Sequence, residues 1–296
     1  MLLTLLLACN ADKGALDPLD SVEPAGPVRV VTFGDVHGDV DAARGALKLA
    51  GVLDDSDTWI GGATQVVQVG DQLDRGDDER EILDLFEDLR IQAVEAGGAF
   101  YPLLGNHEVM NVELDLRYVT DGGFADFADV PYESDDAEIL GYPEEQRGRV
   151  AAFRPAGEYA MKLSEHLVIL QLEGTIFVHG GVLPEHVDFG IDAINEETGA
   201  WMRGEGSRSD PMVSGDPPIW SRHYSDDPDD ADCALLDEVL TMTGADRMVV
   251  AHTVQEDGIN SACGEQVWRV DVGMAAYYGG VPEVLEIVEG EVLVLD

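Results

Sequence analysis

Gly70-Asp71-Gln72-Leu73-Asp74-Arg75-Gly76 is the stretch that decides the fold, because it directly follows a short apolar run. That run, Val66-Val67-Gln68-Val69, is rich in β-branched residues and bounded by glycines, which favours a buried strand over a helix. Two carboxylates and a guanidinium then follow within a single loop. Burying such groups is costly unless each meets an opposite charge, so we expect Asp71 to bind a metal ion and Arg75 an anion. A loop of this composition, taken alone, is more often merely solvated.

The same order of an apolar strand, a small residue and a metal-type ligand recurs along the chain. Strands of this kind are predicted at 28–33, 64–69, 100–104, 175–178 and 248–251. The ligand-type residues that follow them are Asp35, His37, Asp71, Asn106, His179 and His252. At an extended strand end, side chains two residues apart point to the same side, so Asp35 and His37 can ligate one ion. We expect the six ligands to meet at one edge of a sheet.

The ligand types indicate which metals such a site binds. Carboxylate, imidazole and amide oxygen donors without a thiolate suit borderline-to-hard divalent ions such as Mn, Fe or Zn. Six ligands are too many for one open catalytic ion, but they suit two ions that share a carboxylate, about 3.5–4 Å apart. At each single position there is an alternative without metal, since an isolated His179 or His252 is more often a hydrogen-bonded core residue. Repetition at five strand ends favours the metal site.

Three segments resemble the signature blocks of the calcineurin-like metallophosphoesterases, in the form used by the PPP-type phosphoprotein phosphatases. They are Gly34-Asp35-Val36-His37-Gly38, Gly70-Asp71-Gln72-Leu73-Asp74-Arg75-Gly76 and Gly105-Asn106-His107-Glu108. Further segments resemble the bacterial Shewanella-like branch of that family: Ile219-Trp220-Ser221-Arg222, Val250-Ala251-His252-Thr253-Val254-Gln255 and Trp268-Arg269-Val270-Asp271-Val272-Gly273-Met274. The resemblance extends from about Val28 to the C-terminus. It implies an α/β fold, the four-layer metallophosphoesterase sandwich, in which helices flank two central mixed β-sheets.

The resemblance also implies how the ligands divide between two divalent ions. The first ion would be held by Asp35, His37 and Asp71, and Asp71 would bridge to the second. Completing the second site are Asn106, His179 and His252. The family carries a tyrosine-containing loop further along the chain, but Val272-Gly273-Met274 stands in that region here. No tyrosine is therefore assigned to the site.

The catalytic groups follow from the same resemblance. His107 would be the general acid, oriented by Asp74, and Arg75 would bind the phosphoryl oxygens together with Asn106 and His107. A second phosphate-binding arginine is expected, and the tryptophan-arginine motif favours Arg222. The alternatives for that second arginine are Arg203 and Arg208.

These roles describe hydrolysis of a phosphomonoester by metal-activated water, with inversion at phosphorus. Two cations neutralise the dianion and lower the pKa of a bridging water towards about 7. An imidazole beside a carboxylate then protonates the leaving alkoxide. Phosphoprotein is the leading substrate class by resemblance, and a dinucleoside polyphosphate or other nucleotide hydrolase is the alternative. A non-catalytic surface lipoprotein with a structural metal site is disfavoured, because a closed site has no use for His107, Asp74 and Arg75.

The N-terminus carries a separate signal. Residues 1–8 are almost wholly apolar, too few for a transmembrane helix of about 20 residues, and Ala8 precedes Cys9 as in a lipoprotein cleavage site. Residues 10–27 are rich in Asp, Pro, Ala and Gly, which predicts a flexible acidic tether. We expect an exported protein anchored to the membrane through lipid on Cys9. The basic segment that normally opens such a signal is missing, so either the true start lies upstream or the signal is not functional. In the second case the protein is cytoplasmic.

Composition limits the domain organisation and the partners. A chain of 296 residues that is 45% hydrophobic can bury a large core, which predicts one catalytic domain at 28–296 with an insertion around 109–154. Sixty acidic residues against seventeen Lys plus Arg give a net charge of −43. Nucleic acid and anionic lipid surfaces both need a basic footprint, so neither is expected as a partner. The same charge repels phosphorylated substrates until salt screens it, over about 8–10 Å.

The remaining sequence predicts regular elements. Helices at 41–50 and 77–96 each follow a ligand loop and lead to the next strand, which makes βαβ units. The segment 109–154 has a weak pattern, and is either an insertion that shapes substrate access or a solvated helical excursion. A hairpin at 284–295 is expected in a second, more antiparallel sheet. Cys233 and Cys263 form a disulfide in an exported protein, or remain as two buried thiols.

Overall fold

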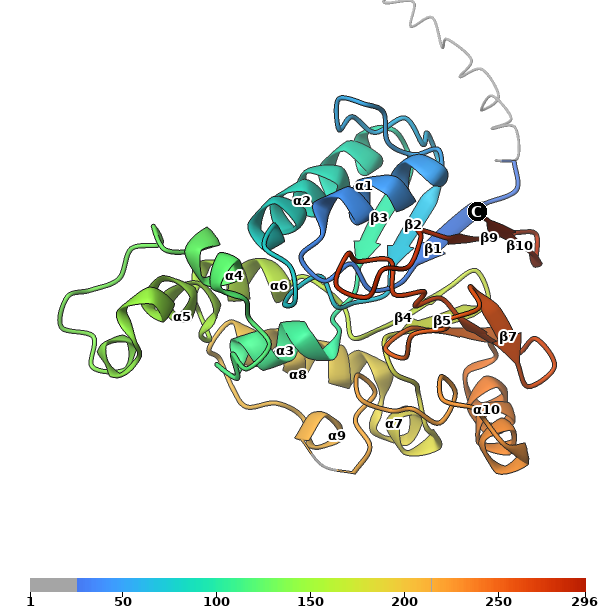
Figure 1. Cartoon of the computed structure of the whole chain (residues 1–296). Helices are drawn as coiled ribbons and strands as arrows, with labels where there is room; N and C mark the ends of the chain where they lie inside the picture. Colours follow the sequence, from blue (N-terminus) through green and yellow to red (C-terminus); the bar gives the residue numbers. More distant parts are fainter. Residues whose placement is uncertain (1–25, 214) are drawn as a thin grey trace, which may run out of the picture.

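The computed structural model describes residues 26–213 and 215–296 (Figure 1). In these residues the strands form two five-stranded sheets of mixed direction, packed face to face. The segment predicted as a lipoprotein signal, residues 1–9, lies outside the described residues, as does most of the predicted tether. Among the described helices, none combines the length and the apolar character needed to cross a bilayer.

The first sheet has the strand order β10-β9-β1-β2-β3. Its strands are β1 (Arg29–Phe33), β2 (Gln65–Gln68), β3 (Ala99–Pro102), β9 (Val284–Val288) and β10 (Glu291–Leu295). The neighbouring strands β1, β2 and β3 are parallel, as the predicted βαβ units require. The C-terminal hairpin β9–β10 was expected in the second sheet, and that expectation is wrong. The free edge of β1 accepts β9 in antiparallel register, with Val30 opposite Ile287.

The second sheet has the strand order β4-β5-β6-β8-β7. Its strands are β4 (Ile169–Leu172), β5 (Thr175–Val178), β6 (Arg247–Val250), β7 (Asn260–Ala262) and β8 (Val267–Arg269). The three inner strands β5, β6 and β8 are parallel, and an antiparallel strand closes each edge. Both sheets are therefore mixed, which confirms the predicted fold class.

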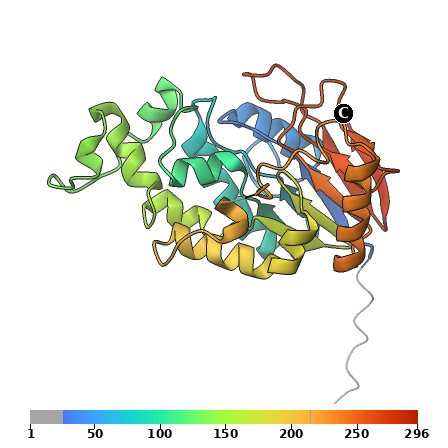
Figure 2. The ribbon, with the colours of Figure 1, turned by 90° about the horizontal axis from the view of Figure 1, so that it is seen from below.

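Helices cover the outer faces of both sheets and make the four layers (Figure 1). Two of them, α1 (Val40–Leu49) and α2 (Glu79–Glu95), lie on the first sheet and match the predicted helices within two residues. Below the second sheet lie α7 (Pro184–Phe189), α8 (Ile191–Met202) and α10 (Asp230–Thr243), the yellow and orange helices of Figure 2. A short helix, α9 (Asp210–Val213), precedes α10.

Three hydrophobic clusters correspond to the three interfaces between these layers. Alternate residues of a strand face opposite sides of its sheet, so one strand serves two clusters. In β1, Val31 and Phe33 pack against α1 and α2, whereas Val30 faces the second sheet. Val67 of β2 also lies in that inter-sheet cluster, where it meets residues of the second sheet such as Phe177. The layers are thus held together by apolar contacts on both faces of the first sheet.

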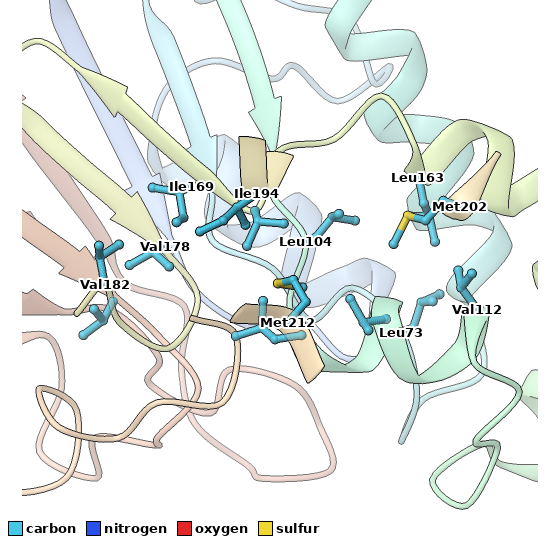
Figure 3. Packing of buried hydrophobic residues seen from close by; sticks show 14 of the residues in the cluster. Leu73, Leu104, Val112, Leu163, Ile169, Val178, Val182, Ile194, Met202 and Met212 are labelled. Carbon is cyan, nitrogen blue, oxygen red and sulfur yellow. The ribbon is translucent and has the colours of Figure 1, made fainter. Parts of the chain in front are cut away.

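The residues predicted as an insertion, 109–154, fold together with their neighbours on either side into short helices beside the second sheet. They are α3 (Asn106–Val112), α4 (Asp121–Asp126), the 3-10 turns η1 (Ile139–Gly141) and η2 (Glu144–Gln146), α5 (Arg147–Phe153) and α6 (Glu158–Leu163). Val112 and Leu163 point into one core with Ile194 and Met202 of α8 (Figure 3). Phe153 of α5 is buried in the same cluster. The alternative of a merely solvated excursion is therefore wrong.

Candidate active site

Six predicted ligands converge where the carboxyl ends of five strands meet. Four follow strands of the first sheet, two after β1 and one each after β2 and β3, and the other two follow β5 and β6 of the second. The prediction of one sheet edge was therefore too simple, because the edges of two facing sheets provide the ligands. All six line or adjoin one small cavity, and all but His252 are buried: Asp35, His37, Asp71, Asn106 and His179.

Asp71 lies at the centre of this cluster. Its Oδ2 is 3.8 Å from His37 Nε2 and 3.2 Å from His179 Nε2. Asp35 Oδ2 lies 3.7 Å from the same nitrogen of His37. On the other side, His179 Nε2 is 3.0 Å from Asn106 Oδ1 and 3.1 Å from His252 Nδ1. The cluster thus has two lobes that share the Asp71 carboxylate. Two groups of side chains are close enough to hold a metal ion: Asp71 with His37 and His107, and Asp71 with His179 and His252.

Two histidines are oriented for metal binding by backbone carbonyls. The Nδ1 of His37 lies 2.9 Å from the carbonyl oxygen of Leu73, and the Nδ1 of His179 lies 2.8 Å from that of Val69. Because Nδ1 donates its hydrogen there, the lone pair is on Nε2, which faces the cluster. Burial also lowers the pKa of His37 to about 4 and that of His252 to about 2, which keeps both rings neutral. Neutral imidazole is the form that binds metal.

The donor set fits divalent cations. Burial, together with the nearby charges of Asp271 and Asp71, raises the pKa of Asp35 well above its ordinary value. Asp35 Oδ1 and His252 Nε2 are buried atoms without a hydrogen-bond partner. Buried carboxylates without cationic partners are costly, and bound cations would remove that cost. The residues present therefore agree with the predicted divalent metal ions.

Unusual backbone geometry delivers the ligands. His37, Asp71 and His252 all have left-handed backbone, with φ values of 39°, 55° and 68°. His37 is therefore in a turn rather than in the extended strand end that we expected, although it still faces the cluster. A side chain on Gly105 would place its Cβ 2.2 Å from Asp71 Oδ1, so only glycine fits there. Residues held in such conformations are concentrated at functional sites.

Glu108 fixes the loops that carry two of the ligands. Its Oε2 accepts hydrogen bonds from the backbone N–H groups of Asp71, at 2.9 Å, and Gly105, at 2.7 Å. Its Oε1 accepts from the backbone N–H of Gln72 at 2.8 Å. The loops after β2 and β3 are therefore joined by one buried carboxylate. Sequence reasoning placed Glu108 in a motif but assigned it no role.

His107 and Asp74 lie next to each other, as the prediction of a general acid oriented by a carboxylate requires. His107 Nδ1 lies 2.5 Å from Asp74 Oδ2, and both side chains are almost completely buried. His107 Nε2 lies 3.8 Å from Asp71 Oδ2 and faces the cavity. Burial opposes protonation of His107, but the charge of Asp71 and the bond to Asp74 raise its pKa above the ordinary value. The ring can therefore hold a proton beside the ligand cluster.

Arg75 and Arg222 both line the cavity, which has a volume of about 110 Å³. Arg75 Nε is buried without a hydrogen-bond partner. The Nη1 of Arg222 donates to Thr253 Oγ1 at 2.6 Å, which holds this arginine next to the His252 loop. The two alternatives for the second arginine lie elsewhere and make ion pairs of their own: Arg203 with Glu205, and Arg208 with Glu113.

Sequence reasoning missed an aromatic rim around the cavity. Tyr118, Trp220 and Tyr278 line its mouth, each with its ring against one site histidine: His107, His252 and His37. The Arg75 guanidinium lies 4.6 Å from the ring centre of Tyr118 and 5.5 Å from that of Tyr278. The absence of a tyrosine from 272–274 was thus misleading, because the tyrosine enters four residues later. The pair Tyr277-Tyr278 was the available signal.

Known proteins share this fold. The family model for calcineurin-like phosphoesterases matches residues 28–256, and the chain belongs to that family. It is accordingly a metal-dependent phosphoester hydrolase, as predicted.

Among known proteins, the chain is similar to the Shewanella-like phosphatases, as its motifs indicated. It is 40% identical to Shewanella-like protein phosphatase 2 of Arabidopsis thaliana, over 88% of this chain and 75% of that protein. It is 31% identical to an uncharacterized protein of Schizosaccharomyces pombe, over 90% and 79%. The crystal structure of a cold-active protein-tyrosine phosphatase of a psychrophilic Shewanella species superposes with a TM-score of 0.71. The identity to it is 25%, over 92% of this chain and 81% of that one.

Proposed function

We propose that this chain is a two-metal phosphoprotein phosphatase that hydrolyses phosphomonoesters. One observation carries the proposal: a single carboxylate, Asp71, is shared by two groups of metal-type ligands, next to a cavity that His107 and Arg75 also line. A structural metal site would be closed by its ligands and would not need an acid and an arginine at its opening. We assign Asp35 and His37 with Asp71 to one ion. The other is assigned to Asp71, Asn106, His179 and His252.

The protein groups have separable tasks in this reaction. Bound metal ions would supply positive charge to the phosphate and acidify a water molecule. Arg75 offers a planar fork for two phosphoryl oxygens, and Arg222 reaches the same cavity from the other rim. His107 donates the proton on Nε2 to the leaving oxygen, because its Nδ1 is occupied by Asp74. Asp74 stabilises the protonated ring and fixes its orientation.

The aromatic rim supports phosphotyrosine as the preferred residue within the phosphoprotein class. Tyr118, Trp220 and Tyr278 present ring faces and edges around the cavity, and aromatic pairs contribute about 0.5–1.5 kcal/mol beyond their buried area. A phosphotyrosine ring can make such contacts and a phosphoserine cannot. The similar Shewanella protein is named a protein-tyrosine phosphatase, which agrees with this proposal.

The test is Mn²⁺-dependent hydrolysis by the full chain. We expect turnover of an aryl phosphate, and higher kcat/KM for a phosphotyrosine peptide than for the same peptide with phosphoserine. His107→Ala should lower kcat by about 10²–10⁴-fold while metal remains bound. If the protein binds two ions but hydrolyses none of these substrates, the phosphatase proposal is wrong. Faster hydrolysis of dinucleoside polyphosphates would instead identify the nucleotide hydrolase alternative.

A further inference from the structure

A fully buried arginine lies behind the acid–base pair. Arg149 belongs to α5, within the segment predicted as an insertion, and its side chain is 0% exposed. Its guanidinium carbon lies 4.8 Å from the ring centre of Phe153 and 5.2 Å from that of Phe127. A buried guanidinium is stable only when its N–H groups are bonded to acceptors. The identity of those acceptors shows what Arg149 does.

The five N–H donors of Arg149 all have acceptors. Nη1 donates to Glu79 Oε2 and to the carbonyl oxygen of Gly123, the latter at 3.0 Å. Nη2 donates to Glu79 Oε1 at 2.8 Å and to Asp74 Oδ1 at 3.5 Å. Nε donates to Asn111 Oδ1 at 2.9 Å. Apart from the Gly123 carbonyl, the acceptors belong to Asp74 itself or to Glu79 and Asn111. Both of these residues are hydrogen-bonded to Asp74.

These acceptors restrain Asp74 from three directions. Glu79 Oε1 accepts the backbone N–H of Asp74 at 2.5 Å. Asn111 Nδ2 donates to Asp74 Oδ1 at 3.0 Å and to the carbonyl oxygen of His107 at 2.9 Å. Asp74 itself has left-handed backbone, with φ of 68°, a conformation that persists where surrounding contacts hold it. Arg149 therefore closes a ring of hydrogen bonds through Asn111, His107 and Asp74.

Arg149 also controls the charge around the pair. Glu79 is 0% exposed and its two oxygens are both bonded to Arg149. Without that arginine, a second buried carboxylate would face Asp74, and like charges at short range repel strongly in a buried environment. Because the Arg149 guanidinium offsets the charge of Glu79, Asp74 can stay ionised next to His107.

We propose that Arg149 is a positioning residue for catalysis, which holds Asp74 and Asn111 so that His107 is aimed at the leaving oxygen. The inference rests on the proposed role of His107 as general acid. It gives the segment around α5 a part in the reaction, rather than in substrate access alone.

The test compares two substrates that differ in their need for a proton. Phenyl phosphate releases a phenolate with a pKa of about 10, like that of tyrosine, whereas 4-nitrophenyl phosphate releases a much weaker base. Arg149→Lys keeps the positive charge but removes the planar guanidinium, whose two Nη atoms bind both oxygens of Glu79. We expect its kcat for phenyl phosphate to fall about 10–100-fold, with a several-fold smaller loss for 4-nitrophenyl phosphate and little change in KM. Bound metal should be unchanged.

A second variant tests whether a loss of activity in Arg149→Lys comes from misfolding. Arg149→Met combined with Glu79→Gln removes the buried pair as a unit, so no unpaired carboxylate remains. It should show the same selective loss. Arg154→Lys is the matched control, since Arg154 lies in the same segment but pairs with Asp136, away from His107. It should not change the ratio of the two rates.

The outcomes separate this inference from the proposed function. If the Arg149 variants lose both activities by the same factor, or neither, Arg149 has only a structural role and the inference is wrong. If His107→Ala shows the selective loss while the Arg149 variants do not, the general acid stands and only the inference fails. If His107→Ala itself loses both activities equally, the acid assignment fails and the inference fails with it.

Discussion

At the scale of single residues, Asp71 has the most demanding position, because both ligand groups need its charge. We predict that Asp71→Asn loses at least one bound ion per chain, since a neutral amide cannot offset two cations. Metal content measured by mass spectrometry, with circular dichroism to verify the fold, tests this. Asp77→Asn is the matched control, because Asp77 lies on the same loop, is exposed and has no place in the cluster. Full occupancy in Asp71→Asn would contradict the assignment.

Gly105 allows a second prediction. Its replacement by alanine would place a methyl group 2.2 Å from Asp71 Oδ1 and 2.5 Å from Asp71 N. The carboxylate must move, and a displacement of about 1 Å at a catalytic site costs on the order of 100-fold in rate. We therefore expect Gly105→Ala to lose activity far more than stability, as measured by kcat and by thermal unfolding. Gly141→Ala, where nothing lies within 4 Å, should change neither quantity.

The candidate ligands could be predicted from the sequence because each follows a strand within a few residues. Arg149 could not, because its partner Glu79 lies 70 positions away and nothing local marks either residue. Tyr278 was missed for a related reason. It reaches the cavity through a loop rather than a strand end, so neither the strand pattern nor the family spacing located it.

At the scale of elements, the disulfide between Cys233 and Cys263 joins α10 to the turn between β7 and β8. The sequence left this pairing open, because thiols and disulfides look the same in a sequence. The two cysteines are 30 residues apart, so the bond should stabilise the fold by about 3–4 kcal/mol. Replacing both by serine should lower the free energy of unfolding in guanidinium by that amount. Reductant should lower it in the parent protein and not in the variant, and equal midpoints for the two proteins would refute the prediction.

Element types were easier to predict than element partners. The helices after the first two ligand loops were predicted within two residues, because apolar periodicity and terminal glycines are local signals. The hairpin β9–β10 was also found, but it was assigned to the wrong sheet. Its neighbour β1 lies about 250 residues earlier, and both strands are buried on either face, so their pattern does not specify a sheet.

At the scale of the whole molecule, the net charge of −43 should select among substrates. Repulsion at a distance lowers the encounter rate of acidic phosphopeptides, whereas basic flanking residues are attracted. We expect kcat/KM to be several-fold higher for a phosphopeptide with lysine flanks than for its glutamate-flanked counterpart at low salt. The preference should shrink as NaCl approaches about 0.5 M, where screening acts within a few ångströms. If the preference does not change with salt, it comes from local contacts and the prediction of long-range repulsion is wrong.

The position of the ligand cluster between two sheets has a consequence for the life of the protein in a cell. Ions held there would take their ligands from the segments after β1, β2 and β3 on one side and after β5 and β6 on the other, an arrangement that the unfolded chain cannot offer. Binding to the native state alone adds about 2.7 kcal/mol when the free ion is at a hundred times its dissociation constant. Metal starvation would then reduce the abundance of the enzyme as well as its turnover, because more molecules would open and be degraded.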